Sequence, residues 1–387
     1  MKSLLRVIAA CLSLFAPAAV ADQSNLSVEV RALLASFQET YGFPGATVAY
    51  VTTDGEVQSF AVGFSDVEAG IEMTPKTRML AASIGKTIWG ILVLSLEAEG
   101  LISRSDLISK YLADEPWFSR LPNAGKITIG QLLTHTSGLP DHVYMDGVAT
   151  ELITMGHKET FDPKDLVTFV LDAPALFEAG AKWSYSDTGY ILLGLALEAA
   201  MDVSVFELAA ERVLEPLGLA DTVPSNSPVI KGIAAGYTTK DNPFGLAPRT
   251  MDGSGHLTWN PVVEWTGGGF ASTSADLALW GRALFSGSAI DADYLRILLD
   301  GFAIHPDAPG MLYGAGVAIY QDTPYGPVYG HGGWIPGYVS SLRHYADHNL
   351  TIAFQINSDV GVVDDSTDIV PELEAALAQL LIGAAEH

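Results

Sequence analysis

Residues 83–86 read Ser83-Ile84-Gly85-Lys86 and open a stretch in which apolar residues recur at helical spacing. These residues are Ile84, Ile88, Ile91, Leu92 and Leu96. With Gly100 as a stop signal, the pattern predicts a helix from Ser83 to about Glu99. Lys86 then lies one turn after Ser83 on the same face, where its amine can reach the Ser83 hydroxyl.

Lys86 stands where a helix start usually carries an acid. The N-terminus of a helix has a partial positive charge, and the third residue after a serine cap is normally a Glu or Gln. A lysine held against this charge and partly desolvated can accept a proton, and a serine beside it can be a nucleophile. The alternative is that Ser83 only caps the helix and Lys86 only extends to solvent. A single Ser-x-x-Lys pair does not decide between them.

The two ends of the chain carry strand patterns. Turn signals such as Thr53-Asp54-Gly55 and Asp347-His348-Asn349 separate short runs of β-like composition. The expected strands are residues 46–51, 57–64, 312–321, 326–330, 338–345 and 350–356. Amphipathic patterns predict a helix before them, residues 24–41, and another after them, residues 370–382. We therefore expect one antiparallel sheet built from both chain ends and flanked by helices.

The middle of the chain is mostly helical in pattern. The expected helices are residues 83–99, 104–112, 128–134, 163–171, 188–201, 203–213, 275–286 and 291–299, and residues 218–270 are expected to be extended loop. The sequence thus predicts an α/β (α+β) fold. Residues 22–75 and 301–387 form its sheet domain, and residues 76–300 form a mostly helical insert, with the functional site at their interface.

The charge balance of the chain argues against some classes of binding partner. The 387 residues include 45 acids and 20 bases, a net charge of −25. Nucleic acids and anionic membrane surfaces are therefore not expected partners, because phosphate binding needs clustered Lys and Arg. The oligomeric state is not encoded in any pattern that we recognise.

Residues 1–21 resemble an export signal. Lys2 and Arg6 precede an apolar run, and Ala19-Val20-Ala21 is a small-residue cleavage site before Asp22. An exported, periplasmic or secreted protein starting near Asp22 is expected. A lipoprotein signal ending at Cys11 is the alternative, but its apolar run would be short. Cys11 is the only cysteine, so the mature chain has no disulfide or thiol nucleophile. No later stretch is long and apolar enough to span a membrane.

Two further motifs could carry chemistry. Trp183-Ser184-Tyr185-Ser186-Asp187 precedes an apolar helix pattern, and a tyrosine near a lysine can act as a base or proton shuttle. The alternatives are an aromatic plug for Tyr185 and a helix N-cap for Asp187. Tyr329-Gly330-His331-Gly332-Gly333-Trp334 places glycines in a strand-like run, which indicates a strand edge facing a ligand, with His331 as a titratable donor.

Other catalytic patterns are missing from the sequence. It contains no Gly-x-Ser-x-Gly elbow, no Gly-rich phosphate loop and no His-Glu-x-x-His. His135 ends a short helical pattern and is interpreted as a structural anchor.

The three motifs together resemble the active-site triplet of the serine β-lactamase-like, penicillin-recognising enzymes. This family includes class C β-lactamases, D-alanyl-D-alanine carboxypeptidases, related esterases and D-aminopeptidases. Further similar stretches are Leu132 to Pro140, Glu215 to Leu219, and Gly267 to Phe270 with Ser272-Thr273. The resemblance covers about residues 30–360.

The resemblance implies a serine hydrolase with a β-lactamase-like fold. Ser83 would attack an acyl carbonyl, while Lys86 and Tyr185 share the proton transfers. Asp187, His331, Gly332, Gly333 and Trp334 would contact the substrate, with the backbone N–H groups of Ser83 and Trp334 as an oxyanion hole. The family needs no metal or organic cofactor, and its substrates are small molecules or peptides.

Two departures from the family pattern bear on the substrate. The second motif usually ends in Asn, whereas Asp187, if ionised, can only accept hydrogen bonds. The third is commonly Lys-Thr-Gly, which holds a substrate carboxylate, whereas Gly332 has no hydroxyl and His331 is at most partly charged near neutral pH. An esterase-like hydrolase of esters or amides with poor β-lactamase activity is therefore expected. The alternatives are a D-alanyl-D-alanine carboxypeptidase or D-aminopeptidase acting on cell-wall peptides, a β-lactamase, and a non-catalytic sensor that acylates slowly.

Overall fold

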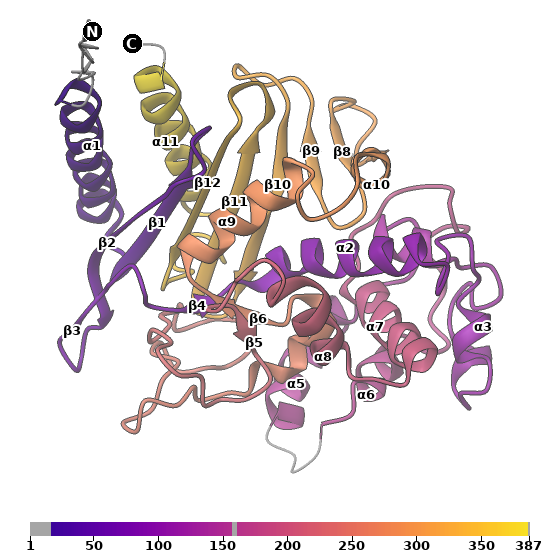
Figure 1. Cartoon of the computed structure of the whole chain (residues 1–387). Coiled ribbons are helices and arrows are strands. Elements are labelled where there is room, and N and C mark those ends of the chain that lie inside the picture. Colours follow the sequence, from indigo (N-terminus) through magenta and orange to yellow (C-terminus); the bar gives the residue numbers. More distant parts are fainter. Residues whose placement is uncertain (1–16, 157–160, 386–387) are drawn as a thin grey trace, which may run out of the picture.

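A nine-stranded antiparallel sheet organises the protein, as a computed structural model of residues 17–156 and 161–385 shows (Figure 1). The strand order is β3-β2-β1-β12-β11-β10-β9-β8-β7. The bounds are β1 Gly45–Val51, β2 Val57–Asp66, β3 Ile71–Glu72, β7 Phe302–Ala303, β8 Met311–Tyr313, β9 Ala318–Tyr320, β10 Val328–Ile335, β11 Tyr338–Tyr345 and β12 Leu350–Ile356. The central pairing of β1 with β12 joins the two ends of the chain, which confirms the expected sheet.

Helices cover both faces of this sheet. α1 (Pro17–Tyr41) and α11 (Ile369–Ala385) lie side by side on one face, and α9 (Ser274–Phe285) packs on the other against β1 and β12 (Figure 1). Alternate residues of β1 enter the two cores, with Val48 and Tyr50 facing α1 and α11, and Ala49 and Val51 facing the helical part. β1 is buried on both faces for this reason.

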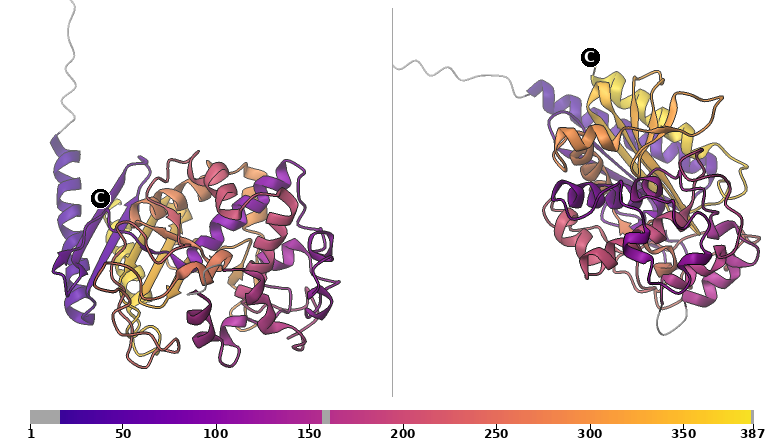
Figure 2. Two further views of the ribbon diagram at one scale, coloured as in Figure 1. Left: turned by 90° about the horizontal axis from the view of Figure 1, so that it is seen from below. Right: turned by 90° about the vertical axis from the view of Figure 1, so that its right-hand side faces the viewer.

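The helical part lies on the side of the sheet away from α1 (Figure 2). Its helices are α2 Gly85–Ala98, α3 Ser109–Leu112, α4 Ile129–Leu133, α5 Val148–Gly156, α6 Lys164–Val167, α7 Asp187–Met201, α8 Val205–Ala209 and α10 Ala292–Leu298. A small sheet, in the order β4-β6-β5, lies among them and consists of Met79–Leu80, Phe270–Ser272 and Val223–Pro224. The domain boundaries expected from the sequence stay a prediction.

Local expectations differ from the structure in several places. The helix expected over residues 104–112 shrinks to α3, because Leu107 and Ile108 pair with the backbone of residues 127–128 instead. The strand expected over residues 312–321 is split into β8 and β9 by a turn that brings Gly316 against the Lys86 carbonyl. Residues 218–270 are not wholly loop, since they contribute β5 and a 3₁₀ segment, Pro261–Gly267. Helix α5 was not expected.

The expected export signal lies mostly outside the described residues. Within them, α1 begins at Pro17 and runs through the expected cleavage site. Among residues 17–156 and 161–385, no helix has both the length and the apolar character needed to cross a membrane.

The packing of α11 yields a stability prediction. Leu377 is fully buried against the sheet, whereas Gln379 on the same helix is exposed. Leu377→Ala is expected to lower the free energy of unfolding by about 2–5 kcal/mol, because it removes buried methyl groups and leaves a cavity. Urea denaturation followed by circular dichroism measures this change. Gln379→Ala is the matched control, and an equal loss in both variants would contradict the packing assigned to Leu377.

Candidate functional site

Ser83 lies in a short 3₁₀ turn, Ala82–Ile84, that leads directly into α2. The chain before it is held on two sides, because the Ala81 N–H donates to the Phe270 carbonyl (2.9 Å) and the Ser340 hydroxyl donates to the Ala81 carbonyl (2.8 Å). Ala82 has a φ of 50°, a left-handed conformation that costs energy for a residue with a Cβ. The turn that presents Ser83 is thus held in a strained backbone conformation by its surroundings.

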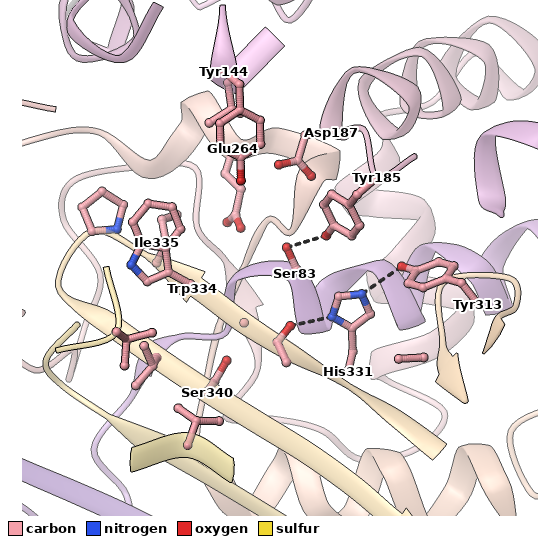
Figure 3. A pocket seen from close by; sticks show the side chains of 18 of the residues that line it. Ser83, Tyr144, Tyr185, Asp187, Glu264, Tyr313, His331, Trp334, Ile335 and Ser340 are labelled. Atoms are coloured by element: carbon pink, nitrogen blue, oxygen red, sulfur yellow. Dashed lines mark hydrogen bonds between the residues drawn. The ribbon is translucent and has the colours of Figure 1, made fainter. Parts of the chain in front are cut away.

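The Ser83 hydroxyl does not cap the helix. Ile84 is the N-cap residue of α2, and no side chain caps this end. Instead the Ser83 Oγ accepts hydrogen bonds from the Lys86 Nζ (3.0 Å) and from the Tyr185 hydroxyl (2.9 Å). The capping interpretation of Ser83 is therefore wrong, and the three side chains meet at one oxygen (Figure 3 shows the Tyr185 bond).

Lys86 has no exposed surface, and the alternative that it extends to solvent is wrong. Its amine lies 2.5 Å from Asp187 Oδ1, donates to the Gly267 carbonyl, and lies over the rings of Tyr185 and Tyr190, 4.9 and 5.2 Å from their centroids. A buried charge needs such partners, since desolvation alone would cost several kcal/mol. Asp187 therefore neutralises the lysine beside the nucleophile.

Asp187 has a different structural role from the expected one. Ser186, not Asp187, is the N-cap of α7, because its hydroxyl accepts from the Gly189 N–H. Asp187 is the first residue of that helix, and its carboxylate is turned toward Lys86. The N-cap alternative for Asp187 is corrected accordingly.

His135 holds the loop that carries Tyr185. Its carbonyl accepts from the Ser184 N–H (3.0 Å) and its Nδ1 from the Ser186 N–H (3.1 Å), while its ring packs 4.1 Å from the Tyr185 ring between centroids. His135 also has a left-handed φ of 56°. The anchor interpretation thus agrees with its contacts.

Burial, followed by the charge of Asp187, raises the pKa of Tyr185 well above its usual value, so this side chain is a neutral phenol.

Both ring nitrogens of His331 are engaged within the protein. The Gly332 carbonyl can only accept, so the bond of 2.5 Å places the proton on His331 Nδ1. Tyr313 then donates its hydroxyl to Nε2 (2.8 Å; Figure 3). Burial and the nearby Lys86 charge lower the pKa of His331 to about 3. His331 is therefore neutral, and neither nitrogen is free to donate to a substrate.

The glycines that follow His331 differ in their surroundings. A Cβ on Gly333 would lie 2.3 Å from the Ala81 carbonyl oxygen, so the close approach of β10 to the Ser83 turn requires glycine. A Cβ on Gly332 would meet nothing nearer than 3.8 Å. Trp334 is held by a hydrogen bond from its Nε1 to Asp359 (3.1 Å). The oxyanion hole at the Ser83 and Trp334 N–H groups stays a prediction.

A cavity of about 530 Å³ joins these residues. Ser83, Tyr185, Asp187, His331, Gly332, Gly333 and Trp334 all line it, whereas Lys86 lies behind Ser83. Most of the other lining side chains are apolar or aromatic. Figure 3 shows Tyr185, Asp187, Glu264 and His331 around Ser83.

The lining residues that the sequence analysis did not single out include Tyr144, Glu264 and Tyr313. Tyr144 and Glu264 lie in segments without periodic patterns, and Tyr313 belongs to a run that was assigned as one strand. No sequence signal marked them, because their role depends on contacts with distant elements.

Glu264 is the second carboxyl group in this cavity. Its Oε2 accepts from the Gly269 N–H (3.0 Å), and its carboxyl group lies on the same side of the cavity as Ser83 and Asp187 (Figure 3). Burial raises the pKa of Glu264 to about 7, and Asp187 adds to this rise while Lys86 opposes it. This side chain therefore changes charge near neutral pH.

The stability difference between Glu264→Gln and wild type should depend on pH. A raised pKa in the folded state stabilises the fold at low pH, and this contribution is lost as the pH rises through about 7. Glutamine keeps the acceptor for Gly269 and removes the charge. The variant should therefore gain stability over wild type from pH 5 to pH 8, by on the order of 1–3 kcal/mol.

Urea denaturation at the two pH values measures this gain. Glu207→Gln, at an exposed position of α8, is the control and should show no such trend. A Glu264→Gln difference that does not change between pH 5 and pH 8 would contradict the assignment.

No group of three or more His, Cys, Asp or Glu side chains is arranged to hold a metal ion in the part of the chain that the structure describes.

The sequence and the fold both match known proteins. The Beta-lactamase family matches residues 30–377 of the chain. The chain is 23% identical over 373 residues to penicillin-binding protein 4* of Bacillus subtilis (strain 168), covering 94% of this chain and 76% of that protein. It is 24% identical over 347 residues to a D-aminopeptidase of Brucella anthropi, covering 89% of this chain and 61% of that protein.

Solved structures extend this likeness. D-amino acid amidase from Ochrobactrum anthropi SV3 aligns with a TM-score of 0.76 at 20% identity, over 94% of this chain and 99% of that chain. At this identity the alignment shows a shared fold. Since the family match spans most of the chain, and the fold is the one expected for it, this protein belongs to the Beta-lactamase family of serine hydrolases, which act through an acyl-enzyme.

Proposed function

We propose that this protein hydrolyses neutral esters or amides through an acyl-enzyme on Ser83. The observation that carries the proposal is the meeting of Lys86 and Tyr185 at the Ser83 Oγ, with hydrogen bonds of 3.0 and 2.9 Å. A serine hydroxyl becomes a nucleophile when a neighbouring group can take its proton. Two candidate groups lie within hydrogen-bond distance, at the edge of a cavity large enough for a small substrate.

The reaction has two balanced steps. The Ser83 Oγ bonds to the acyl carbon, the ester C–O or amide C–N bond breaks, and the proton lost by Ser83 passes to the leaving group. Water then attacks the acyl carbon, restores the Ser83 hydroxyl and releases the acid. Because the pKa of Tyr185 is raised, this side chain is better suited to relay the proton as a neutral phenol than to act as a permanently ionised phenolate base. Lys86 and Tyr185 both contact the Ser83 Oγ, so either can take part in the transfer.

The third motif disfavours substrates with a carboxylate. His331 is neutral and its nitrogens are occupied, and Gly332 supplies no hydroxyl. Asp187 is balanced by Lys86, but the Glu264 carboxylate adds negative charge to the cavity above about pH 7, and this charge would repel an anionic group. Penicillins and peptides ending in free D-alanine both carry one. Poor turnover of β-lactams and weak carboxypeptidase activity follow from these residues.

We also propose that the protein is exported, on the basis of residues 1–21.

Ser83→Ala tests the nucleophile directly. The variant should lose turnover of p-nitrophenyl acetate by a factor of about 10³ or more in kcat/KM, because the acyl-enzyme can no longer form. Wild type should hydrolyse this ester faster than a chromogenic cephalosporin. The opposite order of rates would overturn the ester and amide proposal. A burst followed by a stable adduct on Ser83 would instead identify a sensor that does not turn over.

A second candidate is the hydrolysis of amides or peptides that carry a free amino group. Two similar proteins are named as a D-aminopeptidase and a D-amino acid amidase. The specific observation in its favour is the charge of the cavity. Asp187 balances Lys86 at 2.5 Å, so the Glu264 carboxylate has no such partner among the cavity-lining side chains near Ser83. A substrate ammonium group would supply one.

D-Phenylalanine p-nitroanilide and its N-acetyl derivative test this candidate. Wild type is expected to prefer the free amine at pH 8, and Glu264→Gln should reduce the ratio of the two kcat/KM values by about tenfold, the effect of losing roughly one charged hydrogen bond. Turnover of p-nitrophenyl acetate by the same variant reports any general damage. Equal rates for the two anilides in wild type would exclude this candidate.

A further inference from the structure

The tip of the β10–β11 hairpin forms one wall of the catalytic cavity. Pro336 and Gly337 join the two strands, and Trp334 and Pro336 line the cavity. β9 pairs with β10 only from Val328 to Gly330. Beyond Gly330, the described strands pair with β10 on one side alone, through β11. The tip therefore needs support from another part of the chain to keep a fixed position.

One carboxylate oxygen holds this tip by two hydrogen bonds. Asp359 Oδ2 accepts from the Trp334 Nε1 (3.1 Å) and from the Gly337 N–H (3.1 Å). The first donor is a side chain of β10, and the second is the backbone of the turn that follows. Gly337 has a left-handed φ of 88°, and a Cβ there would lie 3.0 Å from the Gly236 backbone, so this turn fits closely against its surroundings. Asp359 thus fixes both the end of the strand and the turn.

Asp359 is itself firmly held, shortly after the end of β12. Its N–H donates to the Tyr237 carbonyl (3.1 Å), and its carbonyl accepts from the N–H groups of Val362 and Val363 (both 3.0 Å). The Tyr237 N–H in turn donates to the Gly337 carbonyl (3.3 Å). The carboxylate and the hairpin tip therefore share one support, the backbone of Tyr237.

The burial of Asp359 has a cost in stability. The residue has no exposed surface, and the Trp334 and Gly337 groups that donate to it are neutral. Burial raises the pKa of Asp359, and the Gly337 N–H opposes this rise. Burying a carboxyl group against neutral partners is expensive. Such departures from the most stable choice are expected where a side chain holds a functional part of a protein.

We propose that Asp359 is a positioning residue for acyl transfer at Ser83, because it fixes the part of β10 that carries the Trp334 N–H. The proposal rests on the acyl-enzyme proposed above and on the expected oxyanion hole. An oxyanion forms in both steps of the reaction, and a displacement of about 1 Å can lower the rate about a hundredfold. The indole and the backbone N–H belong to one residue, so the bond to Asp359 restrains both. Asp359 is not among the described residues that line the cavity, and it acts through Trp334.

Two substitutions of Asp359 test this role with p-nitrophenyl acetate. Asp359→Ala removes the acceptor of both bonds, so kcat should fall about tenfold or more while KM changes less than about threefold. Asp359→Asn can keep an oxygen at the Oδ2 position and should retain at least about a third of the wild-type kcat. Asp241→Ala changes an exposed aspartate and should leave both constants unchanged. Circular dichroism and urea denaturation establish that each variant is folded.

Trp334→Phe approaches the same bond from the donor side. It keeps an aromatic ring, loses the indole N–H and should also lower kcat. In the double variant with Asp359→Ala, kcat should be within about twofold of that of Asp359→Ala alone, because the two changes break the same bond. This variant tests the proposal even if Asp359→Ala does not fold.

Several results would overturn the positioning role. These are a folded Asp359→Ala or a Trp334→Phe that keeps the wild-type kcat, an equal loss of kcat in Asp359→Asn and Asp359→Ala, or fully additive losses in the double variant. A rise in KM with an unchanged kcat would likewise contradict it, because the hairpin tip would then only bind the substrate. The proposed function fails separately, if Ser83→Ala still turns over p-nitrophenyl acetate at the wild-type rate.

Discussion

The burial of one lysine amine constrains the whole active site. Lys86 has no contact with solvent, so every interaction that water would have supplied must come from the protein. The Ser83 hydroxyl, three residues earlier, supplies one of them, and Asp187 and the Gly267 carbonyl supply the others from two distant segments. The helical part must therefore close over the start of α2 before Ser83 acquires its neighbours. The environment of the nucleophile therefore forms only when the fold forms around this amine.

Backbone strain surrounds the same point. Ala82, His135 and Trp265 have left-handed φ angles of 50°, 56° and 39°, although none is glycine. Ala82 presents Ser83, His135 holds the Tyr185 loop, and Trp265 shapes the turn that ends in Gly267. Such conformations persist only where the surrounding contacts fix them. Gly85, Gly333 and Gly316 permit those contacts, because a Cβ on any of them would collide with a carbonyl oxygen.

The charges around Ser83 bear on which substrates the site can accept. The neutral His331, the paired Lys86 and the carboxyl group of Glu264 leave no free cation among the side chains that line the cavity near Ser83. This arrangement supports the proposal that substrates without a carboxylate are preferred. Apolar surface and space lie on the other side of Gly332. Acyl transfer is retained in this chain, while the means of selecting a substrate differ from the family pattern.

The sequence by itself determined the helix that follows Ser83, the strands from both chain ends, and the three motifs, because periodicity and short spacing are local properties. It could not place Glu264 or Tyr313, show that Ser186 rather than Asp187 caps α7, or show that burial keeps His331 neutral. These outcomes depend on burial and on partners far away in the chain. Ser83 and Lys86 indicated the chemistry through their spacing. What surrounds them was decided by the tertiary structure, because only there do α7, β10 and the segment of Glu264 meet.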